Sequence, residues 1–263
     1  MLKFFLLSFF MTSIYAQCNS SNWEIYYNSK NKNMKGCDLQ KIRLRKINLE
    51  DANLSGSNLN NSDFKWGNFK GVNFKESNLL EIDLRETNLI NTNMINVNLE
   101  SADLDGANLT GAKLMNSNLY FTFLTNTILN ESNLKNSDLR GADLTSSSLI
   151  NSILDSINFS GANLHKANLD KSSLHNSNFN GSDLSNTSFH DANLNGADFN
   201  GSNLMNSNLR GADLSGSKFN HTWITNAEFY GANLNGVKSY GLIGEPKSLP
   251  VGWLIEDGIF KPE

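Results

Sequence analysis

Histidine, serine and carboxylate side chains are the groups in this sequence that could carry acid–base, nucleophilic or metal chemistry. The four histidines, at positions 165, 175, 190 and 221, lie at least ten residues apart. None belongs to a metal-binding histidine pair, and the sequence has no nucleophile elbow, P-loop or dinucleotide-binding glycine motif. We therefore predict a protein that is not an enzyme and that binds neither a metal nor a cofactor.

Two cysteines, Cys18 and Cys37, could form one disulfide. The chain-entropy model gives such a bridge about 3 kcal/mol of stabilisation for a loop of roughly this length. Disulfides persist in oxidising compartments outside the cytoplasm. The alternative is that both remain thiols, with Cys37 acting as a small buried residue.

The elements that would position any site follow from an internal repeat. A large apolar residue recurs every five residues from Leu39 to Leu234, in 40 consecutive units without a slip of register. The residue two places earlier is usually Ala, Ser or Thr, and the residue between them is usually Asn or Asp. The fifth residue of the unit is often Gly, Asn or Ser, which tolerate the backbone angles of a corner.

A period of five fits neither a straight helix nor a straight strand. On an α-helix the large residues would scatter around the axis, and in a strand they would alternate between the two faces. They can all point inward only if the chain turns a corner in each unit. The repeat therefore predicts a solenoid of stacked coils.

The repeated pattern A-[DN]-[LF]-x-x resembles the pentapeptide-repeat family over residues 37–236. This resemblance implies an all-β fold, a right-handed quadrilateral parallel β-helix in which each pentapeptide forms one of the four sides. Forty units then make about ten coils, a rod of roughly 48 Å at an inter-strand spacing of about 4.8 Å. The flanking segments are interpreted as short caps, 17–36 at the N-terminus and 237–263 at the C-terminus.

The first sixteen residues predict export. Lys3 is followed by an apolar stretch that is too short to span a bilayer, and Ala16 suits the position before a cleavage site. We interpret 1–16 as a signal peptide, which leaves no transmembrane segment in the mature chain and directs it to the periplasm or the extracellular space. The alternative is an uncleaved N-terminal anchor.

Two surface features could bind a partner. With twenty residues per coil, Arg45, Lys65 and Arg85 would form a basic ladder, which could meet an anionic polymer or acidic lipid headgroups. The alternative is a solvated edge that Glu50, Glu81 and Glu86 neutralise.

The second feature is apolar. Tyr120, Phe121, Phe123 and Ile128 occupy positions that point outward in other units, and exposed apolar patches often mark interaction sites. The alternative is that Phe123 and Ile128 turn inward at an irregular coil.

These features favour an exported, non-catalytic scaffold or protein-binding module whose partner is a protein or an envelope component. The alternative that the family suggests is a cytoplasmic protein that mimics DNA and binds a topoisomerase, which the leader disfavours. A net charge of −4 gives no reason to expect nucleic-acid binding. An imperfectly capped end would allow end-to-end association of identical chains.

Overall fold

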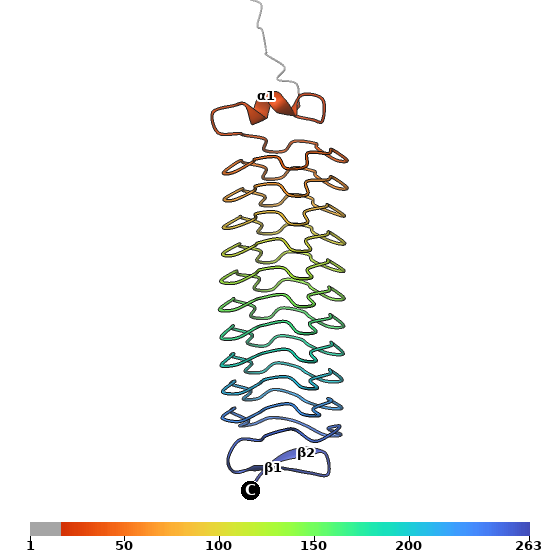
Figure 1. Ribbon diagram of the computed structural model, residues 1–263, viewed down its shortest axis with the longest axis vertical. Helices are drawn as coiled ribbons and strands as arrows, with labels where there is room; N and C mark the ends of the chain where they lie inside the picture. The colour runs from red at the N-terminus through yellow and green to blue at the C-terminus, as the bar shows by residue number, and fades with distance from the viewer. Residues whose placement is uncertain (1–16) are drawn as a thin grey trace, which may run out of the picture.

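The computed structural model describes residues 17–263, which form one continuous coil that rises as a rod (Figure 1). Residue 17 and the C-terminus lie at opposite ends of this rod. The predicted signal peptide, 1–16, falls outside the described residues. No helix within the described part of the chain is long and apolar enough to cross a membrane.

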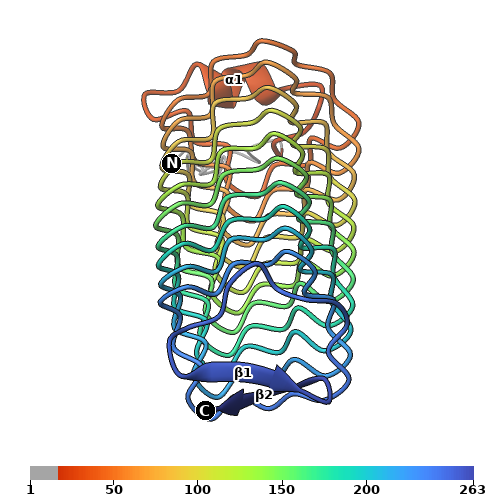
Figure 2. The same ribbon diagram turned by 60° about the horizontal axis from the view of Figure 1, so that its bottom comes forward.

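Each turn of the coil takes twenty residues. Parallel bridges join Asn53 to Asn73 and Asn73 to Asn93, and the same spacing holds from Asn33 to Ser248. Each of the four sides contributes a single bridging residue between two corners, so the sides are too short to count as strands. Figure 2 shows the resulting stack of four-sided turns.

The corners explain which residues the fifth position accepts. Every fifth residue from Lys41 to Gly236 has a positive φ, between 52° at Phe121 and 73° at Gly231. Glycine adopts this left-handed region freely and Asn tolerates it, whereas other side chains are strained there. The repeated Gly and Asn thus fix the corners of the coil.

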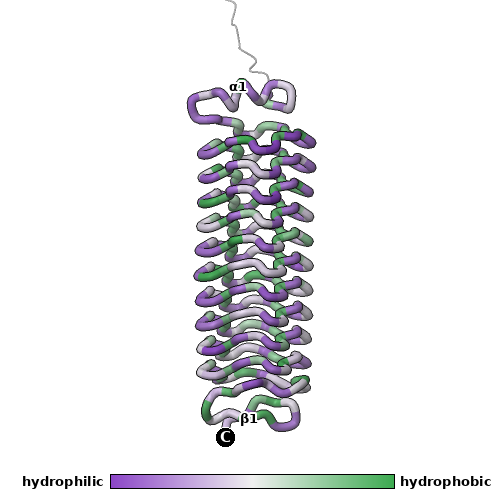
Figure 3. The backbone as a smooth tube through the Cα atoms, viewed as in Figure 1, coloured by the Kyte–Doolittle hydropathy of each residue, from purple (hydrophilic) through white to green (hydrophobic). Residues whose placement is uncertain are grey.

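The core is a column of large side chains inside the coil, and apolar residues recur at matching places in successive turns (Figure 3). In the C-terminal half Phe159, Phe179, Phe199 and Phe219 stack on one another, with ring centroids 5.3, 5.1 and 4.8 Å apart. These four side chains are fully buried. The stack supplies most of the local apolar burial on one side of these coils.

Most buried polar side chains find partners within the coil, with Ser147 among the exceptions. The hydroxyl of Ser132 donates to the carbonyl of Leu129 at 2.5 Å, and Ser and Thr at the same position in other units do likewise. On the outside, the amide of Asn73 donates to Asn53 at 3.3 Å and that of Asn93 to Asn73 at 3.1 Å. These contacts satisfy side chains that would otherwise weaken the stack.

A short helix lies at the N-terminal end. Helix α1 spans Trp23–Tyr27, and no sequence pattern had indicated it. Its residues Trp23, Tyr26 and Tyr27 pack against the core. A disulfide joins Cys18 to Cys37, and both cysteines are buried.

A β-hairpin lies at the other end. Strand β1, Trp253–Glu256, pairs antiparallel with strand β2, Ile259–Pro262, with Ile255 opposite Phe260. The ring of Phe260 meets those of Phe219 and Phe229 at 5.6 and 5.4 Å and so covers the end of the phenylalanine stack.

Candidate binding surfaces

Three of the four predicted apolar site residues are well exposed. Phe121, Phe123 and Ile128 expose 51%, 52% and 39% of their surface, and Tyr120 is half-buried. The bridges Asp103–Phe123–Asp143 and Asn108–Ile128–Ser148 continue the regular ladder. Phe123 and Ile128 therefore point outward from a regular coil, and the alternative of an irregular, inward-turned coil is wrong.

The structure brings Tyr120 and Phe121 together at one corner, and Phe123 follows two residues later. The ring centroids of Tyr120 and Phe121 are 4.2 Å apart, and Phe123 is the central, bridging residue of the next side of the same coil. We call Tyr120, Phe121 and Phe123 the aromatic corner. Ile128 is the central residue of the side after that, so it does not share one flat surface with Tyr120.

Arg140 extends the aromatic corner toward the next coil. Its guanidinium lies 5.2 Å from the centre of the Tyr120 ring, a cation–π distance. Asp138 holds Arg140 in place by accepting bonds from Nε and Nη2 at 2.9 and 2.7 Å. The same bonds lower the pKa of Asp138, because the guanidinium favours the ionised carboxylate.

Phe121 occupies a strained position. Its φ is 52°, in the left-handed region that costs a residue with a Cβ roughly 1–2 kcal/mol. Its ring lies over Gly141 of the next coil, where an added Cβ would come within 2.5 Å of Cε1. Because Gly141 has no side chain, the Phe121 ring can pack against its backbone.

This contact yields a prediction that separates packing from backbone strain. Gly161→Ala is expected to cost about 1–2 kcal/mol of stability, because its φ is 66° and nothing surrounds the added Cβ. Gly141→Ala carries the same strain and must also displace the Phe121 ring. We expect a larger loss on urea denaturation for Gly141→Ala, and equal losses would show that Phe121 does not pack there.

The predicted basic ladder is a set of ion pairs. Arg45 Nε lies 2.7 Å from Asp63, and Arg85 Nη2 lies 2.6 Å from Asp83. Lys65 pairs with Glu86 at 3.4 Å. The expected neutralising role of Glu86 is therefore found, but aspartates on the same side of the coil neutralise the two arginines.

Further ion pairs surround the basic ladder. Arg85 also contacts Asp103 at 3.3 Å, while Glu50 pairs with Lys70 rather than with the ladder. Burial alone would raise the pKa of Asp83, but hydrogen bonds and charge from Arg85 lower it below its ordinary value. Since its cations are already paired, the ladder offers a weak site for an anionic polymer.

Trp66 is a neighbour of the ladder that the sequence analysis did not single out. Its indole N–H donates to Glu86 at 3.1 Å, and Lys65 Nζ lies 4.5 Å from the ring centre. Like Phe121, it is an aromatic residue at a left-handed corner, with φ 64°. An aromatic residue at a position where Gly and Asn are the most frequent residues was the available sequence signal.

The histidines make separate local contacts. His165 Nδ1 lies 2.8 Å from the Ser185 hydroxyl, and the ring of His221 packs on Tyr240 with centroids 4.7 Å apart. Within residues 17–263 no group of three His, Cys, Asp or Glu side chains could hold a metal ion. These contacts join successive coils and suggest no reaction.

Family models match most of the chain. A model of pentapeptide repeats matches residues 33–71, 68–106 and 92–130, and a model of a pentapeptide repeat region matches 127–199 and 172–239. The chain belongs to the pentapeptide-repeat family. Members of this family fold as right-handed quadrilateral β-helices, and the four-sided coil described above is this fold.

A solved structure, that of HetL, supports the same assignment. HetL, a pentapeptide-repeat protein involved in heterocyst differentiation regulation in the cyanobacterium Nostoc, is 28% identical, with a TM-score of 0.57. The match covers 81% of this chain and 93% of HetL. QnrB1, a plasmid-mediated fluoroquinolone resistance protein, is 19% identical over 59% of this chain and 84% of its own, with a TM-score of 0.31. No functionally curated protein matches the sequence.

Proposed function

We propose that this pentapeptide-repeat protein is an exported, non-catalytic scaffold of about ten coils, capped at both ends, that binds a protein partner at the aromatic corner. The observation that carries the proposal is the exposure of Phe121 and Phe123, at 51% and 52%, where neighbouring coils present Gly, Ser or Asp. Contiguous exposed aromatic surface is rare on a monomer and often marks an interface.

The chemistry of the aromatic corner fits a protein partner. Tyr, Phe and Arg are enriched at the centres of protein interfaces. The corner places two aromatic rings beside Arg140, whose position Asp138 fixes.

Export is proposed on two grounds. The apolar leader has the length and the flanking residues of a signal peptide. A disulfide between Cys18 and Cys37 fits an oxidising compartment such as the periplasm or the extracellular space. The alternative, a DNA-mimicking topoisomerase ligand, would act in the cytoplasm, which the leader disfavours.

The proposal predicts that Tyr120→Ser, Phe121→Ser and Phe123→Ser together abolish capture of a partner. Loss of interface hot spots costs about 2 kcal/mol or more, so we expect affinity to fall at least about 30-fold. The measurement is affinity capture from an envelope extract of the host, followed by titration of the captured protein.

A matched control removes exposed apolar residues elsewhere. Trp223, Tyr230 and Ile243 expose 49%, 58% and 45% of their surface near the C-terminal end. Their triple serine variant should retain the partner. If both variants capture the same proteins, or if the wild type captures none, the aromatic corner is not the binding site.

A further inference from the structure

The strongest charge asymmetry of the chain lies in residues 30–46. This segment contains seven lysines and arginines and one acidic residue, Asp38, which gives it a net charge of +6. Because the whole chain carries −4, the remaining residues carry −10. The segment covers the end of the N-terminal cap and the first two sides of the first coil, so the positive charge gathers at one end of the rod (Figure 1).

Four lysines of this segment form what we call the lysine collar: Lys30, Lys35, Lys41 and Lys46. All four are exposed. The ion pairs of the described residues give none of them a carboxylate partner, whereas Arg43 and Arg45 both pair with Asp63. Lys46 also lies over the Trp66 ring, 5.5 Å from its centre, and this contact does not neutralise its charge. The collar therefore differs from the basic ladder, whose cations are already neutralised.

Glu24 on α1 is exposed at this end and leaves residues 17–46 with a net charge of +5. The other nearby acids are directed away from this end. Glu50 pairs with Lys70 at 3.3 Å, and the Asp51 carboxylate lies over Gly71, both in the next coil. Asp38 accepts a bond from the Asn58 amide at 3.2 Å, also one coil further on. The positive charge at the end of the rod is thus compensated locally only by Glu24.

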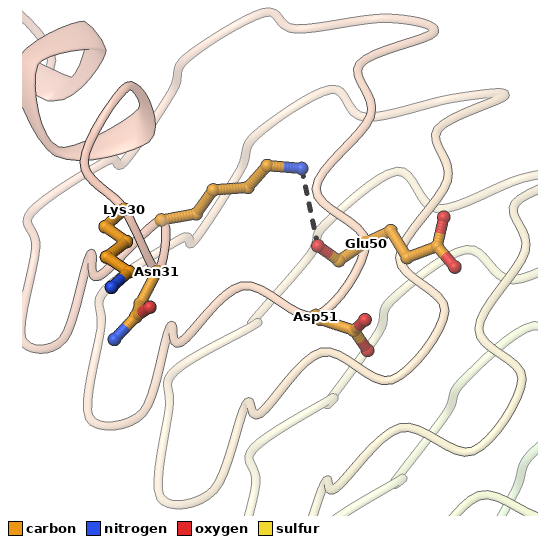
Figure 4. A pocket seen from close by; sticks show the side chains of 5 residues that line it. Lys30, Asn31, Glu50 and Asp51 are labelled. Atoms are coloured by element: carbon orange, nitrogen blue, oxygen red, sulfur yellow. Dashed lines mark hydrogen bonds between the residues drawn. The ribbon is translucent and has the colours of Figure 1, made fainter.

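A shallow pocket at this end lies between the N-terminal cap and the first coil. It is lined by Lys30, Asn31, Lys32, Glu50 and Asp51 (Figure 4). The dashed line in Figure 4 is the bond from the Lys32 ammonium to the carbonyl oxygen of Glu50, at 3.4 Å. The Lys32 ammonium therefore donates a hydrogen bond to the backbone. Lys30 lines the same pocket as Asp51, which occupies a corner of the first coil.

The collar lysines surround the end of the rod. Lys41 and Lys46 occupy two successive corners of the first coil, Lys30 lies beside the third and Lys35 precedes Gly36 at the fourth. A partner on one side of the rod would meet only some of them. A flat surface perpendicular to the axis would meet all four at once.

Apolar residues occupy the same end. Ile25 on α1 exposes 73% of its surface, and Trp23 and Tyr27 are half-buried beside it. Lysines around an exposed aliphatic residue, with aromatic rings nearby, are typical of a surface that meets a membrane interface.

We propose that the N-terminal end of this protein binds end-on to a bilayer that contains anionic phospholipids. The charge distribution favours this orientation. Electrostatic interactions decay over about 8 Å at physiological salt, and the rod is roughly 48 Å long. End-on binding therefore places the collar at the surface and keeps most of the acidic remainder beyond the reach of the membrane charge.

The test is sedimentation of residues 17–263, within which all described contacts are made, with vesicles of phosphatidylglycerol and phosphatidylcholine. A basic residue near an anionic bilayer contributes about fivefold to binding. Changing Lys30, Lys35, Lys41 and Lys46 to Glu should therefore weaken binding at least about 100-fold. Binding should also require phosphatidylglycerol and fall as salt rises.

The control changes the same number of charges on the middle coils. Lys113, Lys135, Lys166 and Lys171 are exposed, and Lys166 and Lys171 have φ of 60° and 59°, like Lys46 and Lys41. Glutamate occupies such corners at Glu76 and Glu131, so the fold should accept the changes. The control variant should bind nearly as well as the wild type.

Two results of the sedimentation would overturn the proposal. If the collar and control variants lose equal vesicle affinity, the net charge of the protein, and not the position of the collar, determines binding. Absence of wild-type binding, or binding to heparin that matches binding to vesicles, would exclude the bilayer as the specific partner of the collar.

Fluorescence tests the orientation. Two variants retain one tryptophan each, Trp23 at the proposed contact or Trp223 near the opposite end, with the other tryptophans changed to Phe. Brominated phosphatidylglycerol should quench Trp23 and leave Trp223 unaffected. Equal quenching of both would show that the rod lies on its side and would refute the end-on arrangement.

Discussion

Phe199→Ala is expected to lower the free energy of unfolding by about 3–5 kcal/mol, the usual range for removing a buried Phe from a core. Phe199 is fully buried and contacts three rings, those of Phe179, Phe189 and Phe219, at 5.1, 6.3 and 4.8 Å. The cavity cannot collapse easily, because the backbone bonds of the coils above and below hold their spacing. Urea denaturation followed by circular dichroism measures the change.

The chain supplies a matched control for this prediction. Leu119 and Leu139 occupy the same column in earlier coils and are also fully buried. Phe199→Leu should therefore cost less than half as much as Phe199→Ala. If the two variants lose equal stability, the contacts between the stacked rings, rather than the volume that they fill, account for the contribution of Phe199.

Replacing Cys18 and Cys37 by serine is expected to lower stability by about 3 kcal/mol in the chain-entropy model. The disulfide closes a 19-residue separation and ties the segment that carries α1 to the start of the coil. The loss should be local, because each coil of a solenoid contacts only its neighbours. Hydrogen exchange should therefore accelerate in residues 17–60 and remain unchanged near Phe260.

A reductant provides the independent check of the disulfide. It should destabilise the wild-type protein by about as much as the double substitution and have no further effect on the Cys18→Ser/Cys37→Ser variant. Unchanged stability of the wild type under reduction would show that the N-terminal packing of Trp23 and Tyr27 holds this end without the bridge.

The repeat alone determined which side chains face the core. An uninterrupted period of five leaves a single register, so Leu39 to Leu234 could be assigned inward without coordinates. The same period placed Gly and Asn at the corners, where the backbone is left-handed. The number of sides came from the family resemblance, since the period itself requires only that the chain turns.

The tertiary structure decided what the surface presents. Arg45 meets Asp63, eighteen residues away, because stacking brings the end of one side next to the middle of the same side in the following coil. Counting in steps of twenty aligned Arg45 with Lys65 and missed this diagonal neighbour. The outward direction of Phe123 also needed coordinates, because a local bulge could have turned its ring inward.

The two ends depended most on tertiary structure. The sequence indicated where the repeat stops, but α1 and the β-hairpin have no periodicity that predicts them. They form because the open ends of an apolar column must be covered, as Phe260 covers Phe219 and Phe229. The lysine collar, which has no carboxylate partner among the described residues, is likewise a property of the assembled end. The N-terminal cap and the first coil must come together before its charge surrounds the axis.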